Sequence, residues 1–82
     1  TGVHAEAGLT TGDFEEAAVK RALHQRAAET VVLASLDKLG TASPFSVAPL
    51  HELAALVVPA ATPQSLRKKL QAGGAKVEIA VA

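Results

Sequence analysis

The sequence predicts an α/β fold, a Rossmann-like three-layer sandwich with a mainly parallel sheet that forms part of a larger domain. Three observations support this prediction. Helical segments alternate with short apolar runs, in the order helix, strand, irregular segment, strand, helix, strand. The first two runs are continuously apolar, which is typical of parallel strands covered on both faces. A chain of 82 residues without cysteine also needs further packing partners to be stable.

The first helix is predicted to run from Asp13 to Ala28. Asp13 and Glu16 have the spacing of a capping box, and the residues that follow are mostly strong helix formers. We expect Glu16, Lys20 and His24 to form a polar face, and an apolar stripe to pack against the sheet. The stripe consists of Phe14, Ala18 and Ala22, with Val19 and Leu23 beside it.

Three strands are predicted, at residues 30–34, 54–58 and 76–81. The first two are short apolar runs rich in β-branched residues or alanine. In the third, apolar residues occupy alternate positions from Val77 onward, as in a strand at the end of a domain.

A second helix is predicted between the last two strands. Thr62 is suited to cap it, and Pro63 is suited to its first position. Leu66 and Leu70 are expected to face inward. Gly73-Gly74 is interpreted as the end of the helix, because it follows a helix and precedes a strand, the reverse of a phosphate-binding loop.

Composition argues against several classes of function. Without cysteine there is no thiolate metal site, and His4, His24 and His51 lack metal-ligand spacing, so no metal and no cofactor are expected. Eight basic residues balance eight acidic ones, which argues against a nucleic-acid surface. The apolar stretch 53–61 is shorter than the roughly 20 residues of a membrane helix. The chain starts at Thr1 without a secretion signal, so we expect a cytoplasmic protein and an excised piece of a longer chain.

The strongest candidate binding residue is Lys38, in the loop that follows the first strand. Ligands of open parallel sheets collect outside the carboxyl ends of the strands. A flexible ammonium there can reach a phosphate, and Gly40 allows the loop to turn closely. Asp37 beside Lys38 is expected to neutralise part of its charge.

Secondary candidates lie near the starts of the two helices. Glu16 and Lys20 are suited to hydrogen-bond sugar hydroxyls, although a Glu and a Lys four residues apart also form an ordinary stabilising surface pair. Thr10 belongs to the segment 8–12, which we expect to be a loop before the first helix. The uncharged start of the second helix at Thr62 leaves its dipole available to an anion, although capping alone also explains it.

Segments 8–10, 15–22, 31–34, 37–40 and 45–50 follow one another in an order and spacing that resemble the sensor domain of DeoR-type transcription repressors. The family's loop usually reads Leu-Ala-Asp-x-Ser-Lys-x-Gly, and Lys38 and Gly40 match the Lys and Gly of that pattern. Ser35 stands where Asp is usual, Asp37 where Ser is usual, and Pro59-Ala60 where Thr-Asp is common.

The resemblance implies a phosphorylated sugar as effector, contacted by Lys38, and a fold similar to ribose-phosphate isomerases and CoA-transferases. It also implies a homo-oligomer that binds operator DNA only through an N-terminal winged helix-turn-helix. That domain and the first half of the sensor domain are absent, so residues 1–82 would be its C-terminal part. Two alternatives stay open: an isomerase relative with Glu16 as general base and Lys38 on the phosphate, and a purely structural oligomerisation unit.

Overall fold

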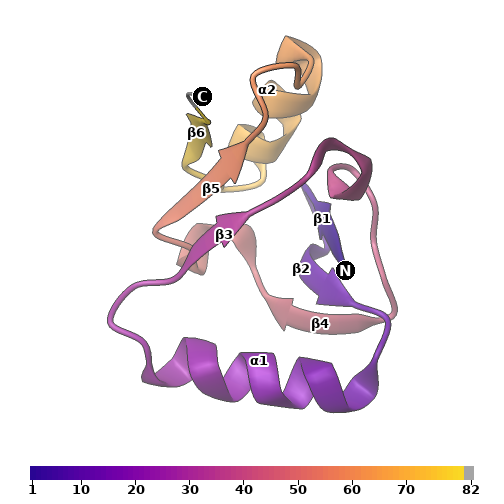
Figure 1. Ribbon diagram of the computed structural model, residues 1–82, viewed down its shortest axis with the longest axis vertical. Helices are drawn as coiled ribbons and strands as arrows, with labels where there is room; N and C mark the ends of the chain where they lie inside the picture. The colour runs from indigo at the N-terminus through magenta and orange to yellow at the C-terminus, as the bar shows by residue number, and fades with distance from the viewer. Residues whose placement is uncertain (81–82) are drawn as a thin grey trace.

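The computed structural model describes residues 1–80 (Figure 1). These residues form a small α/β fold with two three-stranded sheets, one antiparallel in the order β1-β2-β4 and one parallel in the order β3-β5-β6. The strands are β1 (Gly2–His4), β2 (Gly8–Thr11), β3 (Val31–Leu33), β4 (Phe45–Ala48), β5 (Ala55–Val58) and β6 (Val77–Ile79). The helices are α1 (Phe14–Arg26), α2 (Gln64–Ala72) and the short 3₁₀ turns η1 (Leu36–Lys38) and η2 (Leu50–Glu52). The predicted α/β class is confirmed, and the mainly parallel Rossmann-like sandwich is not.

The antiparallel sheet is the element that the sequence did not predict. β1 and β2 form a hairpin, and β2 pairs with β4 with a register shift between Leu9 and Thr10. Residues 8–12 were expected to be a loop, because glycine and threonine there do not form an apolar run. Gly8 opens β2 with a φ of +79°, and a Cβ on it would collide with the Ala48 carbonyl. The glycine is therefore required by the close pairing of these strands.

The parallel sheet contains the three strands that were predicted. β3 pairs with β5 and β5 with β6, with Val32, Leu56 and Val77 in register on the core side. The third strand was predicted to reach residue 81, which lies outside the described residues. The expectation that the first strand is covered on both faces was wrong. β3 is an edge strand in the described residues, and Leu33 on its outer face is 79% exposed.

Helix α1 begins as predicted, because the Asp13 side chain accepts a hydrogen bond from the Glu16 backbone N–H at 2.9 Å. Its packing face was predicted wrongly. The expected apolar stripe is exposed, and Ala17 is the buried residue of the helix. The helix contacts β4 through Arg21 Nη1, which donates to the Ser46 carbonyl at 2.7 Å, and through the Phe14 ring, which packs edge-on against Phe45 with ring centroids 5.6 Å apart. The exposed stripe contains Phe14, Ala18, Val19, Ala22 and Leu23.

Helix α2 packs as predicted, with Leu70 fully buried and Leu66 partly buried against the core. It ends at Ala72 with Gly73 as its C-cap, and Gly74 adopts a φ of +108°, as expected of a glycine after a helix. The capping role of Thr62 was wrong: the N-cap residue is Pro63, without a side-chain hydrogen bond. The Thr62 hydroxyl is buried and has no hydrogen-bond partner among residues 1–80.

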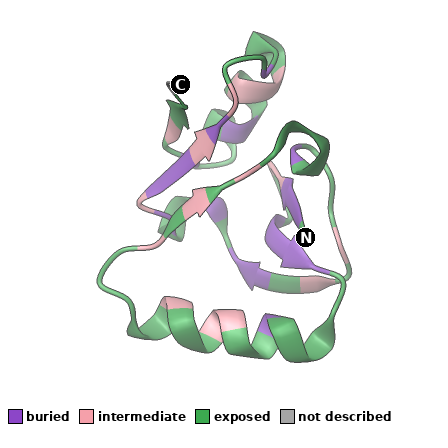
Figure 2. Cartoon of the chain, viewed as in Figure 1, coloured by how far each residue is buried: buried purple, intermediate pink, exposed green. Residues whose placement is uncertain are grey.

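The core lies between the two sheets and under α2 (Figure 2). Buried residues lie along β1, β2, β5 and the C-terminal half of β4, whereas most of α1 and the outer-face residues of β3 are exposed. The largest fully buried side chains are Leu50, Leu53, Leu56, Leu70, Val3, Val58 and Thr11. Within the described residues, no helix is long and apolar enough to cross a membrane.

Candidate functional site

The loop that carries Lys38 is held firmly to the antiparallel sheet. Leu39, only 6% exposed, forms a parallel bridge with Val3 of β1. The Gly40 N–H donates to the Val3 carbonyl at 2.6 Å, and Gly40 has a φ of +81°, which a residue with a side chain rarely adopts. Gly40 therefore lets the chain turn where it meets β1. The loop connects the two sheets, because it follows β3 and is bound to β1.

The Lys38 side chain is available to a ligand. Its Nζ lies 3.9 Å from Asp37 Oδ2, and the two side chains are 48% and 72% exposed. The Ser35 hydroxyl donates a hydrogen bond of 2.6 Å to Asp37 Oδ1. This hydrogen bond is the main cause that lowers the pKa of Asp37, with a smaller contribution from the Lys38 charge. The expected pairing of Asp37 with Lys38 is present but long, so the ammonium can reach other anions.

The hydrogen bond between Ser35 and Asp37 also explains how this loop differs from the usual family pattern. The pattern has a carboxylate at the first of these positions and a hydroxyl two residues later, and this chain has the reverse. The two side chains contact each other directly at 2.6 Å. The exchange therefore keeps a hydroxyl and a carboxylate together beside Lys38.

Thr10 lies behind this loop rather than on its surface. It is 2% exposed, and its hydroxyl donates to the Gly2 carbonyl at 3.1 Å while accepting from the Ser43 N–H at 2.8 Å. The Thr41 hydroxyl in turn donates to the Lys38 carbonyl at 2.9 Å. Thr10 thus fixes the segment that leaves the loop, and its effect on Lys38 is indirect.

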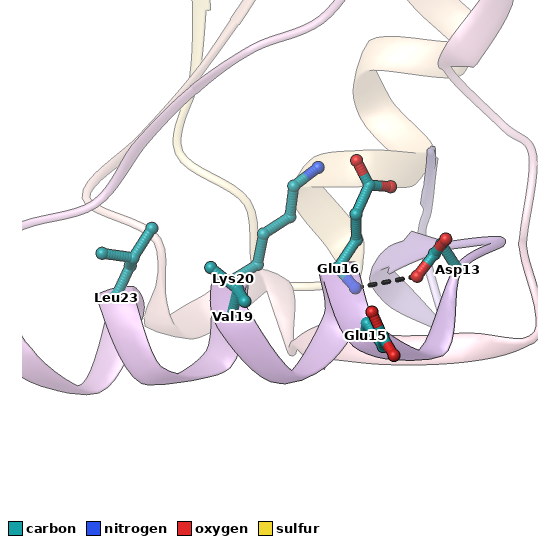
Figure 3. A pocket seen from close by; sticks show the side chains of 6 residues that line it. All are labelled: Asp13, Glu15, Glu16, Val19, Lys20 and Leu23. Atoms are coloured by element: carbon teal, nitrogen blue, oxygen red, sulfur yellow. Dashed lines mark hydrogen bonds between the residues drawn. The ribbon is translucent and has the colours of Figure 1, made fainter.

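Glu16 and Lys20 line an open hollow of about 410 Å³ on α1, together with Asp13, Glu15, Val19 and Leu23. Figure 3 shows the Glu16 and Lys20 side chains extending from the same side of the helix. Within residues 1–80 the two form no ion pair. The Glu16 carboxylate instead accepts a hydrogen bond of 3.2 Å from the buried hydroxyl of Thr11.

The predicted site residues therefore fall into two separate groups. Asp37, Lys38 and Gly40 lie beside β1, whereas Glu16 and Lys20 belong to α1, which packs on β2 and β4. β1 and β4 are the two edges of the antiparallel sheet, so the sheet separates the groups (Figure 1). An isomerase that used Glu16 as base and Lys38 as phosphate ligand would need a substrate that reaches from α1 to the loop beside β1.

Sequence reasoning missed a chain of polar contacts at the C-terminal end of α1. His24 Nε2 lies 2.9 Å from Glu52 Oε1, and His24 Nδ1 lies 2.7 Å from the Thr30 hydroxyl. The His24 side chain is 16% exposed and ties α1 to the start of β3 and to η2. No signal in the sequence relates these three positions. Among residues 1–80, His, Asp and Glu side chains form no group of three or more suited to a metal ion.

Comparison with known proteins finds similarity over most of the chain. A profile of the DeoR C terminal sensor domain matches residues 1–59. The chain is also 32% identical over 77 residues to the HTH-type transcriptional regulator GlpR of Haloferax volcanii, which covers 94% of this chain and 30% of that relative. The chain thus spans less than a third of the length of this curated relative. No solved structure matches the chain.

Proposed function

Since the chain belongs to the family of DeoR C-terminal sensor domains, we propose that it senses a phosphorylated sugar on behalf of a DNA-binding transcription regulator. The observation that carries this proposal is the exposed ammonium of Lys38 on a loop fixed by Val3 and Gly40. A phosphate recognised by a point charge needs a cation that is exposed while its backbone is already ordered. Asp37 and Gly40 belong to the same loop. Thr10 supports the segment that follows the loop, because its buried hydroxyl accepts a hydrogen bond from the Ser43 N–H.

The location of the loop supports a role in signalling rather than in binding alone. The loop leaves β3 of the parallel sheet and is hydrogen-bonded to β1 of the antiparallel sheet. A ligand on Lys38 therefore contacts the connection between the two sheets. If its affinity differs between two arrangements of those sheets, binding shifts the population of arrangements and thereby the DNA affinity of an attached domain.

The same proposal places residues 1–82 in the C-terminal part of the sensor domain of a longer regulator. The relative is more than three times as long as the aligned segment, and its name describes an HTH-type regulator. β3 supports this placement independently. Parallel sheets are usually covered on both faces, yet Val31 and Leu33 on the outer face of β3 are 53% and 79% exposed. A further strand and layer supplied by the longer protein would cover them.

The test is Lys38→Ala in the full-length regulator, with Lys68→Ala, an exposed lysine of α2, as matched control. Binding is measured by calorimetry against a panel of phosphorylated sugars and their unphosphorylated forms. A charge-assisted hydrogen bond contributes roughly 1.5–3 kcal/mol, so Lys38→Ala is expected to weaken phosphosugar binding about 10-fold to 100-fold. The control and the affinity for operator DNA should stay unchanged. Equal effector affinity in wild type and Lys38→Ala would remove Lys38 from the site.

A further inference from the structure

Lys38 follows a carboxylate in the chain but forms no direct hydrogen bond with it. Lys38 Nζ lies 3.9 Å from Asp37 Oδ2, whereas a hydrogen bond between an ammonium and a carboxylate is about 2.7–2.9 Å long. Both side chains are exposed, and the lysine side chain is flexible enough to close such a gap. A closed pair would occupy the ammonium. The side chain that keeps Asp37 away from Lys38 therefore affects how well the ammonium can bind a phosphate.

Ser35 is the residue that binds the Asp37 carboxylate. The Ser35 hydroxyl donates a hydrogen bond of 2.6 Å to Asp37 Oδ1, while the other carboxylate oxygen lies at the longer distance from the ammonium. The same hydrogen bond is the largest cause of the lowered pKa of Asp37, and the charge of Lys38 is the smallest. The carboxylate therefore interacts more strongly with Ser35 than with Lys38.

The backbone around Ser35 is hydrogen-bonded on both sides. Directly before it, the Ala34 N–H donates to the Val57 carbonyl of β5 at 3.0 Å. Directly after it, the first turn of η1 closes when the Lys38 N–H donates to the Ser35 carbonyl at 3.0 Å. The Ser35 hydroxyl thus extends from an ordered backbone. If its hydrogen bond is lost, the exposed Asp37 side chain is the part that becomes free to move.

We propose that Ser35 is a positioning residue for phosphate recognition, because its hydroxyl holds the Asp37 carboxylate away from Lys38 and keeps the ammonium free to bind. This inference rests on the proposed function and deepens it. Ser35 itself touches no ligand and acts through Asp37. Without the Ser35 hydroxyl, the carboxylate and the phosphate compete for the same cation.

The size of this effect is limited by the exposure of the loop. Exposed ion pairs are weak, so competition from Asp37 is expected to change the phosphate affinity by about 2-fold to 5-fold. Asp37→Asn removes the competing charge and leaves Ser35 no carboxylate to restrain. The effect of changing Ser35 should therefore disappear when residue 37 is Asn.

The experiment is a double-mutant cycle on the full-length regulator, titrated with inorganic phosphate at constant ionic strength and followed by NMR at the Lys38 backbone amide. Ser35→Ala is expected to weaken phosphate binding by about 2-fold to 5-fold. Ser35→Thr keeps the hydroxyl and should bind as the wild type does. Asp37→Asn should bind at least as tightly as the wild type, and Ser35→Ala added to it should change nothing further. Ser46→Ala, at an exposed serine of β4, is the matched control and should leave the affinity unchanged.

Two results would overturn this inference while leaving the proposed function intact. One is an unchanged phosphate affinity in Ser35→Ala when Lys38→Ala, measured in parallel, weakens binding. The other is an equal loss for Ser35→Ala in the wild type and in Asp37→Asn, which would mean that Ser35 acts through the backbone of the loop. An unchanged phosphate affinity in Lys38→Ala would instead overturn the proposed role of Lys38, and this inference with it.

Discussion

The two helices of this chain use their apolar residues in opposite ways. α2 has nine residues, buries Leu70 completely and packs Leu66 against the core. α1 has 13 residues and more apolar side chains, yet Ala17 is the one it buries. Besides Ala17, α1 contacts distant parts of the chain through side-chain hydrogen bonds of Arg21 and His24 and through the exposed Phe14 ring, which packs edge-on against Phe45.

This difference shows that an apolar stripe on a helix does not by itself indicate which part of the protein the stripe packs against. The core of the described residues already covers the inner face of α2, so the apolar residues of that face need no further packing partner. The outer face of α1 and the outer face of β3 are both exposed and apolar. These two surfaces are where packing with another segment or another copy has the most to add.

The largest expected effect tests whether α2 belongs to the core and α1 does not. Leu70→Ala removes a fully buried side chain and is expected to lower the free energy of unfolding by about 2–5 kcal/mol. Leu23→Ala removes the same atoms from a side chain that is 65% exposed, and should change stability by no more than about 0.5 kcal/mol. Urea denaturation followed by circular dichroism measures both.

The comparison of Leu23→Ala with Leu70→Ala can also contradict this prediction. If Leu23→Ala destabilises the protein as much as Leu70→Ala, the outer face of α1 is buried in solution. The concentration dependence of that loss then separates the two possible partners. A loss that grows as the protein is concentrated indicates a second copy, and a constant loss indicates another segment of the same chain.

The fold was predictable where local signals and packing agree. The capping side chain of Asp13, the end of α2 at Gly73-Gly74 and the inward face of Leu66 and Leu70 follow from residue chemistry over a few positions. The antiparallel sheet was not predictable, because β2 is buried but contains glycine and threonine. The strand depends on partners distant in sequence, such as the Ser43 N–H, which donates a hydrogen bond to the Thr10 hydroxyl.

The second prediction tests the polar attachment of α1. His24→Ala removes hydrogen bonds to Thr30 and Glu52, and is expected to cost about 1–2 kcal/mol of stability. The coupling between His24 and Glu52 alone should be smaller, about 0.2–1 kcal/mol, because the Glu52 side chain is 48% exposed. A double-mutant cycle of His24→Ala and Glu52→Ala measures it. A loss for His24→Ala smaller than that for Leu23→Ala would mean that the apolar face, and not the polar one, holds α1.

The sequence predicts which residues share the loop of Lys38, but not where the other candidate residues lie relative to it. Asp37, Lys38 and Gly40 are neighbours in sequence, so the chain itself brings them together in one loop. Glu16 and Lys20 are also close in sequence, but only the sheet order shows that their helix packs toward the β4 edge of the antiparallel sheet, whereas the loop of Lys38 lies at the β1 edge. The hydrogen bonds of Thr10 join Gly2 and Ser43, and no local pattern indicates such a pair.

The smallest expected effect concerns Ser35 and Asp37, which are exposed in the loop at η1. Ser35→Ala removes the hydrogen bond that contributes most to lowering the pKa of Asp37 below its ordinary value of 3.8, so the pKa should rise toward that value. Because the folded-state pKa of Asp37 is lowered, its contribution to stability is present above the ordinary pKa and is lost as the pH falls through the lowered one. NMR titration of the Asp37 carboxyl in wild type and Ser35→Ala measures the shift, with Ser46→Ala as a control far from this carboxyl in the sequence. An Asp37 pKa that does not change would show that the Ser35 hydrogen bond does not stabilise the carboxylate. The backbone hydrogen bond of Asp37 and the Lys38 charge would then be the causes that lower the Asp37 pKa.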